Sequence, residues 1–96
     1  MIVSFGDRAT AALYHGERGK RVRQFPPDVR NAAIRKLDVL NGAQELRDMR
    51  SPPGNRLETL RGDLAGHHCI RVNDQWRVVF RWVEGDAHDV RVIDYH

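Results

Sequence analysis

Residues 76–83 read Trp-Arg-Val-Val-Phe-Arg-Trp-Val, an alternation that is typical of a β-strand. Successive side chains of a strand point to opposite faces of a sheet. One face of this strand therefore carries both tryptophans, a valine and the phenylalanine, while the other carries Arg77 and Arg81. We expect the apolar face to form the core of the molecule and to be covered by helices.

Two flanking strands, over residues 67–72 and 88–95, continue the pattern. Their apolar residues must reach the same core face, and a slip of one residue would turn every side chain over. Three-residue loops at 73–75 and 84–86 meet this requirement. The pairs that these loops predict are Val72–Trp76, Arg71–Arg77 and Ile70–Val78 in the first hairpin, and Phe80–Val90, Val78–Val92 and Arg77–Ile93 in the second.

The N-terminal half of the sequence predicts helices. Asp7 can cap a helix that runs to about His15 and stops at Gly16, because glycine tolerates the left-handed conformation. A second helix begins at the prolines of residues 26–27 and ends near Gly42. Its apolar stripe consists of Val29, Ala33, Leu37 and Leu40. The other expected elements are short strands at 2–5 and 57–60 and a further helical turn or two within 43–49.

Length and composition limit the class of protein. The 96 residues make up one domain, residues 1–96, since a chain of this length has apolar material for a single core. Cys69 is the single cysteine, which excludes an internal disulfide and a zinc site built from several cysteines. No apolar run approaches the roughly 18 residues of a membrane span, and the first residues lack a signal-peptide pattern. We therefore expect a cytoplasmic protein with no membrane contact.

Arginine dominates the basic residues. It supplies fourteen of the sixteen cations, and the formal net charge is +3. The planar donor fork of arginine suits bidentate contact with phosphate, so the bias favours a nucleic acid or another anionic partner. A GC-rich genome would produce the same bias through codon usage alone. The positions of the arginines must therefore decide between the two explanations.

The predicted registers gather arginines on the sheet face opposite the core, which we call the arginine face. Its polar members are Arg71, Arg77, Arg81 and Arg91, with Tyr95 near the end of the last strand. Like charges directly opposite one another are unfavourable, and cross-strand pairs change stability by up to about 1 kcal/mol. A bound anion or an acidic partner would offset the repulsion between Arg71 and Arg77. Alternatively, the exposed arginines extend into water and the repulsion is negligible.

The sequence ends on Asp94-Tyr95-His96, a carboxylate, a phenol and an imidazole beside the arginine face. Histidine titrates near neutral pH and can both accept and donate a proton. RNA cleavage needs a base for the ribose 2′-OH, an acid for the leaving 5′-oxygen and cations for the developing charge. The alternative is a frayed chain end without function. His67 and His68 cannot bind one metal ion together, because neighbours in a strand point to opposite faces.

Three segments carry a family resemblance. They are Leu60-Arg61-Gly62-Asp63, the stretch 70–82 (Ile-Arg-Val-Asn-Asp-Gln-Trp-Arg-Val-Val-Phe-Arg-Trp) and Asp94-Tyr95-His96. Together they resemble the HigB toxins of the RelE/ParE superfamily of bacterial toxin–antitoxin systems. The resemblance implies an α+β fold in which two N-terminal helices pack on a curved, mainly antiparallel sheet, similar to the RelE toxins and the microbial ribonucleases.

The same resemblance implies an activity and partners. A HigB toxin enters the ribosomal A site and cuts the mRNA there by 2′-OH attack, which leaves a 2′,3′-cyclic phosphate and needs no metal or other cofactor. The expected partners are a helix-turn-helix antitoxin similar to HigA and the ribosome with its A-site mRNA. Oligomers are expected to form mainly through the antitoxin.

The family's site residues map onto the matching positions. By this resemblance, Arg61 and Arg77 hold the scissile phosphate and stabilise its transition-state charge, and His96 is the acid/base group. Tyr95 stacks on a base or orients the phosphate, and Asp94 orients the imidazole of His96. Further RNA contacts are expected from Arg71, Arg81, Arg91 and Asn73.

Two positions depart from the family pattern. Some HigB toxins carry a histidine where this chain has Glu58, and some carry an arginine where it has Asn73. Glu58 is therefore a candidate base, although a carboxylate also repels phosphate. Arg71, two residues before Asn73, is a candidate substitute for the missing arginine.

Two other functions remain open from the sequence. A toxin similar to ParE would keep the fold and poison DNA gyrase by binding alone, and a plain RNA- or ribosome-binding module would use the arginine face without chemistry. The closing Tyr95-His96 argues against the toxin similar to ParE, because a toxin that acts by binding does not require an acid/base group.

Overall fold

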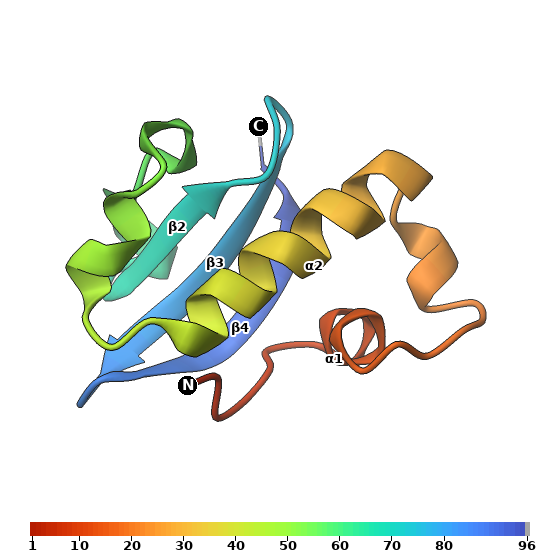
Figure 1. The fold of residues 1–96 in the computed structure, drawn as a ribbon, viewed down its shortest axis with the longest axis horizontal. Coiled ribbons are helices and arrows are strands. Elements are labelled where there is room, and N and C mark those ends of the chain that lie inside the picture. Colours follow the sequence, from red (N-terminus) through yellow and green to blue (C-terminus); the bar gives the residue numbers. More distant parts are fainter. Residues whose placement is uncertain (96) are drawn as a thin grey trace.

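The computed structural model describes residues 1–95, and His96 lies outside the described residues. Two helices cover one face of an antiparallel sheet (Figure 1). The helices are α1 (Arg8–Tyr14) and α2 (Pro27–Gly42), and the strands are β1 (Glu58–Thr59), β2 (His67–Arg71), β3 (Trp76–Val83) and β4 (Asp86–Asp94). The strands lie in the order β1-β2-β3-β4. The predicted α+β fold class is confirmed.

Both helices begin and end close to their predicted positions. The Asp7 side chain caps α1 by accepting a hydrogen bond from the Thr10 N–H at 2.7 Å. Gly16 follows that helix at a φ of +73°, a conformation that glycine adopts without strain. Pro27 opens α2, where a backbone N–H would have no intrahelical partner. The predicted apolar stripe of α2 is buried in the core: Val29, Ala33, Leu37 and Leu40.

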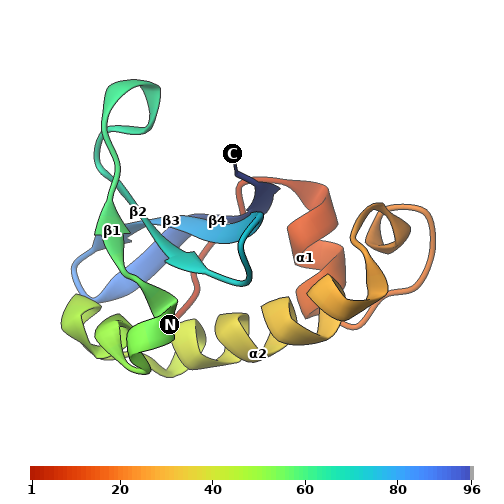
Figure 2. The same cartoon turned by 90° about the horizontal axis from the view of Figure 1, so that it is seen from above.

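The core lies between the helices and one face of the sheet, with α2 running beneath the strands (Figure 2). Val78 and Phe80 of β3 are fully buried there, and both tryptophans of the strand pack against the same cluster from its margin. The Trp76 ring meets Phe25 edge-on, with 5.6 Å between the ring centroids. The predicted alternation of residues 76–83 is therefore confirmed, and it decides which face of the sheet meets the helices.

The first hairpin has the predicted register, with Ile70 opposite Val78 and Arg71 opposite Arg77. The second hairpin differs from the prediction near its turn. Its loop has two residues, Glu84 and Gly85, because Val83 already pairs with Asp86. Both loop residues have positive φ, of +50° and +84°, as the tight turn that best matches strand twist requires.

A β-bulge restores the predicted pairing further along β4. Between the pairs Arg81–His88 and Val79–Arg91, β3 has one residue and β4 has two, with Asp89 at a φ of +52°. Phe80 therefore lies opposite the two residues Asp89 and Val90, and not opposite Val90 alone as predicted. Beyond the bulge, Val78 pairs with Val92 and Arg77 with Ile93, as predicted. The predicted three-residue loop was wrong. The predicted register at the end of the sheet that holds Arg77 is confirmed.

The remaining predicted elements are shorter than expected. Residues 2–5 form no strand and instead make two isolated parallel bridges to β4, at Ile2–Ala87 and Phe5–Val90. The strand predicted at 57–60 is reduced to Glu58–Thr59, and the helical turn expected within 43–49 lies at Leu46–Arg50 as a 3₁₀ helix. Among these segments, β1 joins the sheet as a short strand beside β2.

A second apolar cluster covers the middle of the arginine face. Leu60, Cys69 and Val79 are buried in it, and Leu64 and Ile93 pack against them. Leu64 belongs to the connection between β1 and β2, which rises from the sheet on the side away from α2 (Figure 2). The sequence did not predict this cluster, and it divides the arginine face into two ends.

Candidate active site

Arg71 and Arg77 lie directly opposite one another at the site end of the sheet. Each guanidinium has its own acceptor. Arg71 forms an ion pair with the Asp74 carboxylate, and the Nη1 of Arg77 donates to the backbone carbonyls of Asn73 and, at 3.1 Å, Trp76. The turn between β2 and β3 therefore supplies the acidic partner and the acceptors that offset their repulsion. The sequence left open a bound anion, an acidic partner or extension of both side chains into water, and Asp74 was not among the predicted residues.

Tyr95 completes this end of the face. Its backbone N–H donates to the Gln75 carbonyl at 2.7 Å, which ties the chain beyond β4 to the same turn. The Cζ atom of Arg77 lies 5.9 Å from the centroid of the Tyr95 ring, within the range of a cation–π contact. The Tyr95 side chain remains exposed. Three predicted site residues, Arg71, Arg77 and Tyr95, are thus brought together.

Asp94 and Glu58 border this group on two sides. The Asp94 carboxylate accepts a hydrogen bond from Gln75 Nε2 at 3.1 Å. Glu58 pairs with Cys69 across β1 and β2, so its side chain lies on the arginine face. Burial and, to a smaller extent, Glu58 raise the pKa of the Cys69 thiol, while Arg77 lowers it. Glu58 and Arg77 therefore flank the same buried thiol from neighbouring strands.

Arg61, Arg81 and Arg91 lie outside this cluster. Arg61 is exposed in the connection between β1 and β2. Arg81 belongs to the other end of the face and forms an ion pair with Asp89 at 2.7 Å, which holds the pKa of that carboxyl below its usual range. The stem of Arg91 packs on Gly6, where an added Cβ would lie 2.5 Å from its Cγ.

His96, the predicted acid/base group, lies outside the described residues. His68 lies on the core side, with its ring centroid 5.9 Å from that of Phe80, and His67 pairs with Arg81 on the arginine face. The two neighbours do face opposite ways, as the strand pattern predicts. In the part of the chain that the structure describes, no group of three or more His, Cys, Asp or Glu side chains could hold a metal ion.

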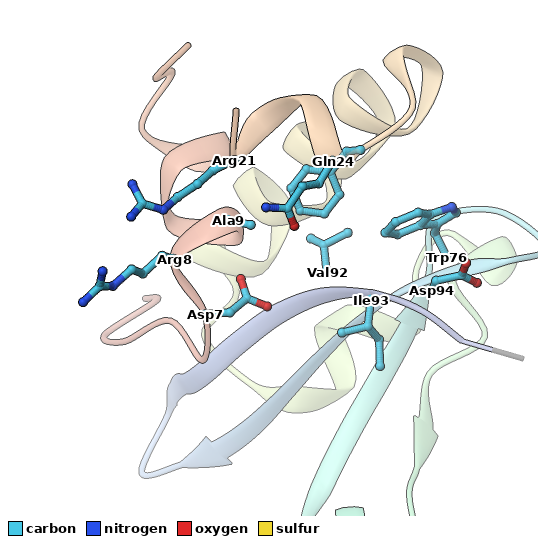
Figure 3. Close-up of a pocket in the computed structure, with 10 residues that line it drawn as sticks. Asp7, Arg8, Ala9, Arg21, Gln24, Trp76, Val92, Ile93 and Asp94 are labelled. Atoms are coloured by element: carbon cyan, nitrogen blue, oxygen red, sulfur yellow. The ribbon is translucent and has the colours of Figure 1, made fainter. Parts of the chain in front are cut away.

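A pocket of about 450 Å³ lies beside the same end of β4, between the strand and the start of α1 (Figure 3). Trp76 and Val92 form apolar parts of its wall, and Arg8 and Arg21 also line the pocket. Of the predicted site residues that the structure describes, Asp94 alone lines this pocket. The cluster around Arg77 therefore sits on the sheet surface and not in this pocket.

Comparison with known proteins identifies the family of this chain. The family model described as the RelE-like toxin HigB of type II toxin–antitoxin systems matches residues 3–96. The chain belongs to the HigB-like toxins. Toxin HigB-1 of Vibrio cholerae serotype O1 is 46% identical to this HigB-like toxin over 87 residues, which cover 91% of the chain and 90% of that protein. The molecule is a toxin of a type II toxin–antitoxin system.

One further relative of the HigB-like toxin and one solved structure extend the comparison. The protein of Proteus vulgaris named Endoribonuclease HigB is 39% identical over 41 residues, 43% of this chain and 45% of that protein. The YoeB–YefM complex from Staphylococcus aureus contains a chain with the same fold, at a TM-score of 0.61 and 14% identity, with coverage of 100% and 98%. Within residues 1–95, no helix is long and apolar enough to cross a membrane.

Proposed function

We propose that this HigB-like toxin is an endoribonuclease that acts in the ribosomal A site and cuts mRNA without a metal ion. The observation that carries the proposal is the cluster of Arg71, Arg77 and Tyr95 at the end of the sheet, directly before His96 in the sequence. The name of the Proteus vulgaris relative, Endoribonuclease HigB, supports the same activity.

The proposed reaction needs one RNA phosphodiester and no other reactant. A base removes the proton of the ribose 2′-OH, and the 2′-oxygen attacks phosphorus. As the bond to the 5′-oxygen breaks, an acid protonates that oxygen, which leaves a 2′,3′-cyclic phosphate and a 5′-OH end. His96 is the proposed acid/base group, and Glu58, on the same face as Arg77, is the second candidate for the base.

The arginines would bind the phosphate and stabilise the charge that develops on it. Guanidinium groups present paired N–H donors that match two phosphate oxygens. Arg77 is the principal candidate, and Arg71 would take the place of the arginine that some relatives carry at position 73. Arg61 would reach the same phosphate from the connection between β1 and β2. Tyr95 would stack on a base or orient the phosphate, and Asp94 would set the His96 ring.

Arg81 and Arg91 are proposed only as outer RNA contacts. Arg81 is engaged by Asp89, and the stem of Arg91 packs on Gly6. Arg81 lies beyond the apolar cluster from the end of the sheet that holds Arg77, and Arg91 pairs with Val79 of that cluster. Their removal should therefore weaken binding more than it slows cleavage.

The proposed partners are the ribosome and an antitoxin. A helix-turn-helix antitoxin similar to HigA would neutralise the toxin, oligomers would form mainly through it, and the cytoplasm would be the site of action. The solved YoeB–YefM complexes support a protein partner for toxins of this fold. A reading frame for a small helix-turn-helix protein beside the toxin gene would support the pairing.

The test adds the purified toxin to translating ribosomes and maps the 5′ ends of the mRNA. We expect cleavage by the parent toxin and a loss of about 100-fold or more on Arg77→Ala or His96→Ala, since each removes charge stabilisation or proton transfer. Arg35→Ala, at an exposed position of α2, is the matched control and should cleave normally. Binding without cleavage, or arrest of DNA gyrase, would refute the proposal.

A further inference from the structure

Asn73 organises the turn between β2 and β3. Its side-chain oxygen accepts hydrogen bonds from the backbone N–H groups of Gln75 and Trp76, each at 2.8 Å. Its own backbone N–H donates to the Trp76 carbonyl at 3.3 Å. Asparagine side chains commonly stabilise turns in this way. The Asn73 side chain and backbone are therefore both fixed, and the direction of its carbonyl is fixed with them.

That carbonyl is one of the two acceptors of Arg77. Both receive hydrogen bonds from Nη1, and the second acceptor is the Trp76 carbonyl at 3.1 Å. The hydrogens of Nη1 are thus directed to the turn. Among the described residues, Nε and Nη2 make no hydrogen bond, and together they form the edge of a guanidinium that can bind two phosphate oxygens.

We propose that Asn73 is a positioning residue for Arg77, and that it acts through the turn rather than by touching RNA. It holds the carbonyl that anchors Nη1, so that the Nε–Nη2 edge is presented to the scissile phosphate. This inference rests on the proposed nuclease function and replaces the expectation that Asn73 contacts RNA directly.

Asp74 has the corresponding role for the facing arginine. Its carboxylate pairs with Arg71, whose side chain is 25% exposed, while the Asp74 side chain is 93% exposed. The same short turn therefore directs one guanidinium towards a carbonyl and the other towards a carboxylate. Two like charges on paired residues are kept in separate positions.

The test compares Asn73→Ala with Asn73→Asp in the ribosome-dependent cleavage assay. Alanine removes the side-chain acceptor, and we expect kcat to fall about 10- to 100-fold, as misplacement of a catalytic group does. Aspartate accepts the same two backbone hydrogen bonds, so it should restore kcat nearly to that of the parent toxin. If Asn73 instead contacts RNA, both variants raise KM with kcat unchanged, and aspartate is the worse because its charge repels phosphate.

A double variant tests whether the effect passes through Arg77. Asn73→Ala should change kcat little when Arg77 is already alanine, because the group that it positions is gone. A full additional loss in the double variant would overturn the proposal. Asn31→Ala, at an exposed asparagine of α2, controls for a general effect of removing an amide.

A measurement on the isolated toxin separates this proposal from the nuclease proposal. The guanidinium N–H signals of Arg77, observed by nitrogen-15 NMR, should report an ordered side chain in the parent toxin and in Asn73→Asp, and a mobile one in Asn73→Ala. Unchanged signals in Asn73→Ala would refute the positioning role. An ordered Arg77 in a protein that fails to cleave mRNA would refute the nuclease function alone.

Discussion

His68 is a titratable residue of the sheet whose environment makes the stability of the fold depend on pH. Its ring packs 5.9 Å from the Phe80 ring, centroid to centroid, and its Nδ1 forms a hydrogen bond of 3.0 Å with the Thr59 hydroxyl. Burial, and to a smaller extent the neighbouring His67, lower the pKa of His68. The folded protein therefore favours the neutral ring more than the unfolded chain does.

The direction of the pKa shift sets the sign of the pH dependence. A histidine with a lowered pKa contributes stability above the unfolded value of about 6.5, and this contribution is lost as the pH falls below it. We expect the free energy of unfolding, measured by urea denaturation, to fall between about pH 7.5 and pH 5.5. His68→Gln should reduce that fall, because it removes the group whose pKa is lowered on folding. An equal pH dependence in His68→Gln would contradict the assignment.

At the scale of elements, one hydroxyl joins α1 to the edge of the sheet. Thr10 is fully buried, and its Oγ1 accepts the hydrogen bond of the Val92 N–H at 2.9 Å. This N–H lies on the side of β4 that faces away from β3, where no strand follows. Thr10 therefore stands in for a missing strand at this point.

Removal of that hydroxyl should destabilise the fold. Thr10→Val keeps the shape of the side chain and leaves a buried N–H without an acceptor, which costs about 1–3 kcal/mol. Thr10→Ser keeps the acceptor and loses only a methyl group, so it should cost about 1 kcal/mol. Chemical denaturation measures both. A valine variant as stable as the parent protein would show that the hydrogen bond contributes nothing.

The elements that the sequence predicted are those that a local pattern decides. Alternation identified residues 76–83, and the caps at Asp7 and Pro27 located the helices. The second turn was predicted one residue too long, because the register alone does not reveal that Glu84 and Asp89 adopt positive φ. A two-residue turn with a bulge and a three-residue turn without one give the same pairing at the far end of the hairpin.

The candidate site was predicted in the same uneven way. The position of Arg71 opposite Arg77 follows from register, and the sequence therefore placed these two charges together. Their acceptors depend on the conformation of residues 73–75. Neither periodicity nor composition indicates which way the carbonyl groups and the Asp74 carboxylate of this turn point. An asparagine at the start of the turn was the available signal for the carbonyl that binds Arg77, since such residues stabilise turns. The apolar cover supplied by Leu64 depends on a long-range contact that no local pattern encodes.

At the scale of the whole molecule, the net charge of +3 predicts a salt-dependent association with RNA. Each phosphate contact to a single strand contributes about 0.7 to the slope of log affinity against log salt. With two contacts, the affinity of the toxin for a single-stranded RNA should fall about 5- to 20-fold between roughly 50 and 200 mM salt. Arg71→Ala removes one phosphate contact and should lower the magnitude of the slope by about 0.7. Arg35→Ala should leave the slope unchanged. A salt-insensitive affinity would contradict phosphate binding.

The way the sheet ends at its two margins governs how copies of the toxin meet. β1 is two residues long, and residues 2–5 run beside the first half of β4 through the bridges Ile2–Ala87 and Phe5–Val90. Long bare strand edges invite other chains to add on and aggregate. In the part of the chain that the structure describes, neither margin offers such a row of backbone groups. Crowded toxin molecules would therefore touch through side chains and would not polymerise into a continuous ribbon.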